Sequence, residues 1–142
     1  MIFEGACHCG AVRVAFETQK SPDEIQVRVC QCSFCRRRGG KTVSDPDGRL
    51  EFRCDPGAMQ RYRFGTATAD FVICRVCAGY LGVVQDIDGE LFGVLNVVGA
   101  DIAALANRPG EPMDYDAEAL AGRMERRRSV WSPAVVLEEA RG

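Results

Sequence analysis

Hydrophobic and polar residues alternate in short segments along the first two thirds of the chain. The segments 12–17 and 25–29 place an apolar residue at every second position, which is typical of half-buried β-strands. Asp88-Gly89 lies between two further segments of this kind and predicts a tight β-hairpin. The pattern predicts a mainly β, antiparallel domain of about seven or eight short strands separated by Gly, Pro, Asp and Ser turns. The remaining strand segments are expected at 50–54, 59–64, 71–74, 80–84 and 91–98.

Helical spacing of apolar residues is confined to the C-terminal part of the chain. Asp101 is expected to cap a short helix over 102–106. Asp116 is expected to cap a second helix, in which apolar residues recur with a helical period up to Met124. Residues 134–142 are expected to form an edge strand or a frayed end. The predicted fold class is therefore mainly β with short C-terminal helices.

Size and composition fit a single soluble domain. The chain has 142 residues, of which 46% are hydrophobic and 27% are charged. A formal net charge of −2 gives no basis for nucleic-acid binding through bulk electrostatics. The apolar runs are too short for a membrane-spanning helix, and the N-terminus lacks the basic start and apolar core of a signal peptide. We therefore expect a cytoplasmic protein that binds neither nucleic acid nor membrane.

The eight cysteines are the most unusual feature of the composition. Reducing compartments keep thiols free, so in a chain without an export signal this number indicates metal or redox chemistry. A disulfide framework, which the even number allows, is the minor alternative. Seven of the eight cysteines form three clusters: Cys7 with Cys9, Cys30 with Cys32 and Cys35, and Cys74 with Cys77.

The spacing of these clusters predicts two zinc sites. Two-cysteine turns combine in pairs into tetrahedral Cys₄ sites, so Cys7, Cys9, Cys74 and Cys77 are expected to hold a structural zinc that adds folding energy. The middle cluster offers only three thiols. Cys54 stands alone in a strand and is expected in the core, although as a fourth ligand it would make the second site structural too. With three ligands the second zinc keeps an open position, at which it can lower the pKa of a thiol or water.

The basic residues near these clusters are less informative. His8 lies between two ligand cysteines and is expected to point away from the metal, which leaves no Ser/His or Cys/His pair. Arg36, Arg37 and Arg38 follow the middle cluster, and such a run is usually solvated. Beside an open metal site, Arg36 and Arg37 are candidates for clamping a substrate carboxylate. The later run 126–128 is interpreted as the basic end of a helix.

The order of the cysteine motifs resembles one known family. The motifs are G-A-C-H-C-G-A-V at 5–12, C-Q-C-S-F-C-R at 30–36, F-G-T at 64–66 and C-R-V-C at 74–77. Together they resemble the glutathione-dependent formaldehyde-activating enzyme family, which includes the centromere protein V relatives. The resemblance covers about residues 3–106 and implies a small zinc-bound fold of the β-tent kind. On this basis 1–142 is expected to be one domain with a core at 3–106 and a helical extension at 107–142.

The resemblance also implies an activity and a set of ligands. The ligand sets are the two derived above from spacing, with a structural zinc at the four-cysteine set and a labile, catalytic zinc at Cys30, Cys32 and Cys35. The implied activity is carbon–sulfur lyase or synthase chemistry, in which a thiol such as glutathione adds to formaldehyde or the adduct is cleaved. The alternatives are a non-catalytic, zinc-stabilised β module that binds a ligand, and redox or metal sensing by the middle cluster.

Overall fold

The computed structural model describes residues 1–115 and 117–139. It is mainly β, as the alternation predicts. Its helices are the 3₁₀ turn η1 (Pro22–Glu24), α1 (Ser33–Arg38), α2 (Ala103–Ala106) and α3 (Leu120–Val130). Its strands are β1 (Ile2–Ala6), β2 (Val12–Glu17), β3 (Arg28–Cys30), β4 (Thr42–Val43), β5 (Arg49–Cys54), β6 (Met59–Tyr62), β7 (Asp70–Cys74), β8 (Tyr80–Ile87), β9 (Glu90–Asn96), β10 (Glu111–Met113) and β11 (Ser132–Glu138).

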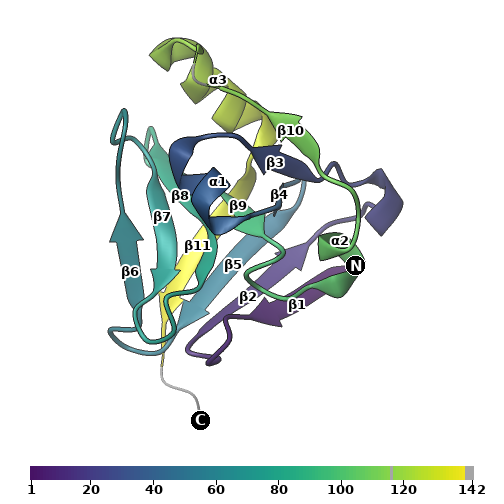
Figure 1. Cartoon of the computed structure of the whole chain (residues 1–142), viewed down its shortest axis with the longest axis vertical. Helices are drawn as coiled ribbons and strands as arrows, with labels where there is room; N and C mark the ends of the chain where they lie inside the picture. Colours follow the sequence, from purple (N-terminus) through teal and green to yellow (C-terminus); the bar gives the residue numbers. More distant parts are fainter. Residues whose placement is uncertain (116, 140–142) are drawn as a thin grey trace.

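One side of the molecule is formed by β1, β2, β5 and β11, which pair in this order (Figure 1). β1, β2 and β5 are antiparallel, and β11 runs parallel to β5. Val14 is opposite Phe52 and Phe16 is opposite Leu50, and all four side chains are buried. The alternation within 12–17 therefore places one face of β2 in the core, where burial of apolar surface stabilises the fold.

The second side contains the antiparallel meander β6-β7-β8-β9 and continues from β9 through β4 and β3 to β10. The turn between β8 and β9 is Asp88-Gly89, with φ angles of 54° and 85°. A two-residue hairpin turn needs positive φ at both positions, which Asp and Gly tolerate best. The predicted hairpin is confirmed.

The C-terminal segment contributes two strands as well as a helix. β10 pairs in parallel with β3 and places Met113 beside Cys30. The expected edge strand is found at 134–138, which pair with β5 and with no second strand of the described chain, whereas Ser132 and Pro133, just before it, pair with β9; residues 140–142 of the expected segment lie outside the described residues. The buried Ser132 hydroxyl also accepts a 2.8 Å hydrogen bond from the backbone of Asp45. β11 therefore joins the two sides of the sheet.

The helix starts differ from the expected ones. Asp101 does not cap α2: it has a φ of 56° in the turn after β9, and Ile102 occupies the N-cap position. Its N–H is held by the carbonyl of Val98, so the backbone there turns sharply instead of entering a helix. α3 begins at Leu120 with Ala119 at its N-cap, and the expected cap, Asp116, lies outside the described residues. In the described part of the chain, no helix has the length and apolar character to cross a bilayer.

Candidate metal centres

Four cysteines from two distant turns meet at one end of the fold. Cys7 and Cys9 lie in the turn between β1 and β2, Cys74 ends β7, and Cys77 lies in the turn before β8. Their Sγ atoms all lie within 4.8 Å of one another, with 3.7 Å between Cys7 and Cys9 and 3.6 Å between Cys9 and Cys74. Sulfur atoms about 2.3 Å from a tetrahedral zinc are about 3.8 Å apart. The four-thiol cluster, as we call this set, therefore fits zinc.

The backbone of both turns is shaped to present sulfur. Ala78 has a φ of 65° and its N–H donates to the carbonyl of Cys74 at 2.8 Å, which closes the turn around the thiol pair. The N–H of Cys77 donates to the Cys74 Sγ at 3.5 Å, and that of Val12 donates to the Cys7 Sγ at 3.3 Å. Donors aimed at sulfur favour the thiolate, which is the form that binds metal.

The protonation of these thiols depends on their neighbours. Burial raises the pKa of Cys74 to about 12. Burial also acts to raise the pKa of Cys77, but backbone N–H groups and the adjacent thiols outweigh it and lower this pKa to about 6. A cation would favour all four thiolates together, so a metal ion bound by the cluster would complete its electrostatics.

The second cluster is formed where β3 meets α1. Cys30 ends β3, Cys32 is the N-cap of α1, and Cys35 lies in its first turn. The thiol of Cys32 accepts the N–H of Cys35 at 3.4 Å, so it caps the helix as a Ser or Asp side chain does elsewhere. The three Sγ atoms lie within 4.8 Å of one another. We call this set the three-thiol cluster; its donor set also fits zinc, with one tetrahedral position left for another ligand.

The thiols of the three-thiol cluster differ in pKa. Hydrogen bonds from the Cys30 and Cys35 thiols lower the pKa of Cys32. Hydrogen bonding to Cys30 and Cys32, together with burial, raises the pKa of Cys35. The cluster thus holds one thiolate readily and resists further loss of protons until a cation is present.

All three of these cysteines line a cavity of about 210 Å³. One wall is apolar and is formed mainly by Phe71, Val83, Val94 and Trp131. Another part of the lining is basic, because α3 and β3 contribute four arginines to it: Arg28, Arg123, Arg126 and Arg127. None of the four-thiol cluster's cysteines lines this cavity. The three-thiol cluster is therefore open to a small molecule from a mostly apolar, positively charged chamber.

Tyr80 connects the cavity wall to the three-thiol cluster. Its hydroxyl lies 3.9 Å from the Cys35 Sγ, and only 5% of the residue is exposed. Burial, and then the nearby thiols, raise the Tyr80 pKa well above its ordinary value, so the phenol stays neutral and can donate a hydrogen bond. The amide of Asn96 fixes the backbone here, since it donates to the Tyr80 carbonyl at 2.9 Å and accepts from the Lys41 N–H at 3.1 Å.

Comparisons with known proteins agree with this arrangement. Residues 2–106 match the glutathione-dependent formaldehyde-activating enzyme family. The chain belongs to this family. The crystal structure of a Rhodobacter sphaeroides protein, determined as a structural genomics target, is similar over 77% of this chain and 97% of the other, with 32% sequence identity and a TM-score of 0.58. The resemblance seen in the motifs is thus confirmed, and residues 107–142 lie beyond the family match.

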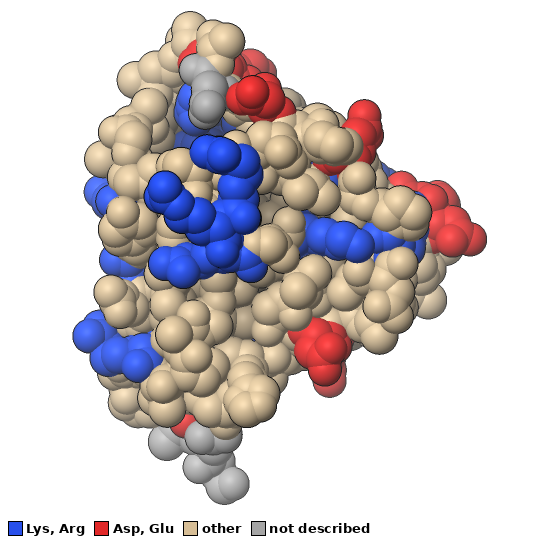
Figure 2. All heavy atoms as spheres, viewed as in Figure 1, with Lys and Arg blue, Asp and Glu red and all other residues tan. Residues whose placement is uncertain are grey.

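In this family member the other cysteine, the histidine and the first arginine run lie away from the cavity. Cys54 is buried in β5 with its Sγ 3.7 Å from the Leu137 carbonyl, and it belongs to neither thiol cluster. His8 is exposed. Arg36 and Arg37 are exposed on α1, where Figure 2 shows basic side chains gathered, and they are absent from the cavity lining. Their role as a carboxylate clamp stays a prediction.

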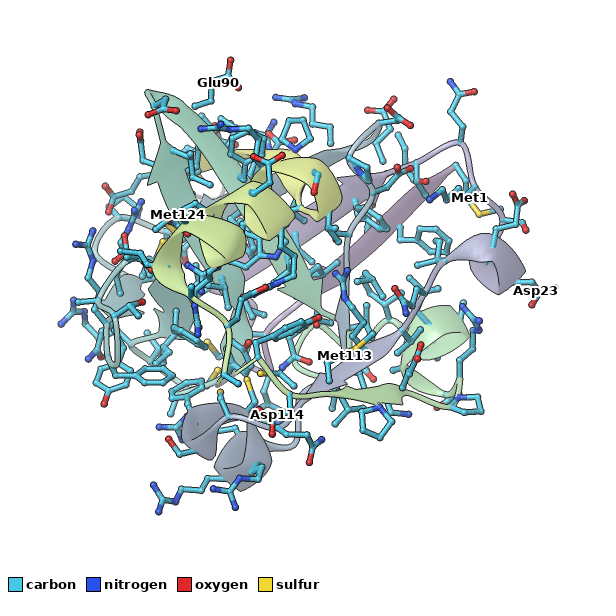
Figure 3. The ribbon with its side chains drawn as sticks, turned by 90° about the horizontal axis from the view of Figure 1, so that it is seen from above. Met1, Asp23, Glu90, Met113, Asp114 and Met124 are labelled. Atoms are coloured by element: carbon cyan, nitrogen blue, oxygen red, sulfur yellow. The ribbon has the colours of Figure 1, made fainter. Side chains whose placement is uncertain are left out.

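The cavity arginines were not recognised as site residues from the sequence. Arg126 and Arg127 were interpreted as the basic end of a helix, and Arg28 as the outward position of a strand. The pairing of β10 with β3 brings these arginines together. It places Met113 beside Cys30, and the chain continues from there to α3 (Figure 3). One signal was available: α3 has basic residues spaced three and four apart, which places Arg123, Arg126 and Arg127 on one face.

Proposed function

We propose that this protein is a zinc-dependent carbon–sulfur lyase or synthase that acts on a thiol–aldehyde adduct such as S-hydroxymethylglutathione. Family membership supports formaldehyde activation that depends on glutathione. The observation that carries the proposal is the difference between the two clusters. The four-thiol cluster has a full tetrahedral donor set, whereas the three-thiol cluster has one ligand fewer and opens into the cavity.

The reaction joins a thiol to a carbonyl carbon. The sulfur lone pair forms the new carbon–sulfur bond, the carbonyl π bond breaks, and the proton lost by the thiol ends on the former carbonyl oxygen. A zinc ion held by Cys30, Cys32 and Cys35 would lower the pKa of a thiol at its fourth position and keep the sulfur as thiolate at neutral pH. In the reverse direction the same bond breaks and formaldehyde leaves.

The surrounding side chains fit this chemistry. The neutral Tyr80 hydroxyl beside Cys35 is placed to donate a hydrogen bond to an oxygen that gains negative charge during addition. The apolar wall containing Phe71 and Val94 lowers the local polarity, so hydrogen bonds and charges in the chamber act more strongly than in bulk solvent. The eight free cysteines are consistent with a reducing compartment such as the cytoplasm, where glutathione is the main small thiol.

Zinc stoichiometry with and without glutathione tests the proposal. We expect two zinc ions per chain in reduced protein, one of which a chelator removes readily and glutathione protects. Exchange between free formaldehyde and its glutathione adduct, followed by NMR, should be faster with the enzyme than without it. A protein with one zinc per chain and no effect on exchange would instead be a zinc-stabilised binding module.

A further inference from the structure

Two arginines of the basic part of the cavity are buried without an ion-pair partner among the described residues. Arg28 is 7% exposed and Arg127 is 8% exposed. Neither has an ion-pair partner within residues 1–115 and 117–139; their side chains donate only to neutral groups. Arg28 donates to the Ser44 hydroxyl at 2.6 Å, and Arg127 donates to Thr68 at 2.9 Å and to Gln85 at 2.5 Å. Buried cations are normally paired, because an uncompensated charge in the interior is costly.

The remaining arginines share one carboxylate. Glu118 lies 3.0 Å from Arg126 and 3.9 Å from Arg123. The Nε atoms of Arg123 and Arg127 are buried and have no hydrogen-bond partner in the described structure. Four arginines therefore line the cavity, and in the ion pairs given for the described residues Glu118 is the carboxylate that contacts two of them. Donors remain for an additional anion.

The arginines also act on one another. Burial, followed by the charges of Arg126 and Arg123, lowers the pKa of Arg127 to about 10. An anion placed among the arginines would reverse this effect, because it would stabilise the Arg127 cation.

We propose that this end of the cavity binds a doubly charged oxyanion group, and that the thiol substrate carries such a group on the side away from its sulfur. Arg28, Arg126 and Arg127 would hold the group, and the sulfur would point toward Cys30, Cys32 and Cys35; the sulfur end rests on the function proposed above. A phosphate or a pair of carboxylates has this chemistry, and guanidinium groups bind both through paired hydrogen bonds.

Most of the arginines at this site lie in the C-terminal part of the chain, so the proposed anion site would give this chain a substrate specificity of its own. Arg126 and Arg127 lie on α3, outside the residues 2–106 that match the family. β10 pairs with β3, and α3 is the next helix along the chain (Figures 1 and 3). The family domain thus supplies the thiols, whereas the C-terminal segment supplies most of the charge that would select the substrate.

Inorganic phosphate at pH 8, where it is mainly dianionic, is the direct probe. Calorimetric titration of the zinc-loaded protein should show one saturable phosphate site per chain, and acetate at the same concentration should bind much more weakly. Arg126→Gln should lower phosphate affinity by about tenfold or more, since a charge-assisted pair is lost. Arg128→Gln is the matched control, because Arg128 is exposed on the same helix and pairs with Asp88; its affinity should stay within about twofold of the unchanged protein.

Absence of saturable phosphate binding, or equal losses in the Arg126 and Arg128 variants, would overturn the proposal. If Arg126→Gln lowers the melting temperature, Arg28→Gln provides a second variant with the same expected loss of affinity. Cys32→Ser should retain phosphate binding, because it alters only the sulfur end. Phosphate binding without formaldehyde turnover would reject the enzymatic function and support the anion site. Turnover without phosphate binding would support the enzymatic function and reject the anion site.

Discussion

The two thiol clusters use the same side chain but differ in number of ligands, in surroundings and in access. The four-thiol cluster ties the β1–β2 turn to the β7–β8 turn, 65 residues apart between Cys9 and Cys74. The three-thiol cluster is local, since Cys30, Cys32 and Cys35 span six positions at the start of α1. A metal in the first crosslinks the chain, whereas a metal in the second adds little that α1 does not already fix.

This difference separates stability from chemistry. A site that joins distant segments restricts the unfolded chain and contributes to folding. A site with three local ligands, a free position and a chamber in front of it is suited to bind a substrate atom. Zinc would therefore stabilise the fold at the four-thiol cluster and bind substrate at the three-thiol cluster. Variants in each cluster test whether these two roles are separate.

The largest expected effect is on stability, from Cys74→Ser. Cys74 is completely buried and is close to the other three thiols of its cluster. Its replacement removes a ligand and leaves a buried hydroxyl, so we expect a loss of about 3 kcal/mol or more and a melting temperature about 10 °C lower. Thermal unfolding with parallel zinc analysis measures both, and we expect one zinc per chain to be lost.

Cys54→Ser is the control for this variant. Cys54 is a buried thiol in β5 that belongs to neither cluster. The same chemical change there should cost about 1–2 kcal/mol and leave the zinc content unaltered. Equal destabilisation by both variants, with equal zinc content, would show that the four-thiol cluster is only part of the core.

Cys32→Ser should have the opposite profile. Ser is a favourable N-cap, so it can accept the Cys35 N–H in place of the thiol and preserve α1. We expect the melting temperature to change by no more than about 3 °C while turnover of the glutathione–formaldehyde adduct falls about 100-fold or more. Ser33→Ala, an exposed neighbour in the same helix, should leave turnover unchanged. Normal turnover in Cys32→Ser would remove the three-thiol cluster from the mechanism.

The sequence allowed both clusters to be predicted because their ligands are close together along the chain. Cys7 and Cys9, or Cys74 and Cys77, indicate a metal turn without any knowledge of the fold. The β8–β9 hairpin was predictable for the same reason, since Asp88-Gly89 determines it locally. Strand alternation then gave the mainly β class, as the burial of β2 and β5 confirms.

The features that were missed depend on pairings between distant segments. β11 pairs with β5 across more than 80 residues, for example Ala134 with Leu50, and nothing in the local pattern identifies β5 as its partner. The basic end of the cavity depends in the same way on the pairing of β10 with β3, after which residues of α3 line the same cavity as Arg28. The sequence shows the arginines of α3 only beside other residues of the same helix. Their role in the cavity depends on Arg28 and the three thiols, which are distant in sequence.

The smallest expected effect concerns Asp70, at the start of the strand between the two clusters. β7 carries Phe71 in the cavity wall and Cys74 in the four-thiol cluster. Although burial acts to raise the pKa of Asp70, hydrogen bonds from Arg63 and Arg61 outweigh it and hold this pKa below its ordinary value. Because the folded-state pKa is lowered, the stabilisation is present above the unfolded value of about 3.9 and is lost as pH falls through the folded value.

Asp70→Asn should therefore unfold about 1 kcal/mol more easily at pH 7, as expected for partly exposed ion pairs. The difference between the two proteins should shrink as the pH falls below about 3.9 and disappear once the pH lies below the lowered folded-state pKa of Asp70, where both proteins carry a neutral side chain. Urea titrations at pH steps measure this difference, and any zinc release common to both proteins cancels in it. If Asp70→Asn also lowered turnover with both zinc ions retained, stability and chemistry would be coupled through β7, and the separation between the clusters would have to be abandoned.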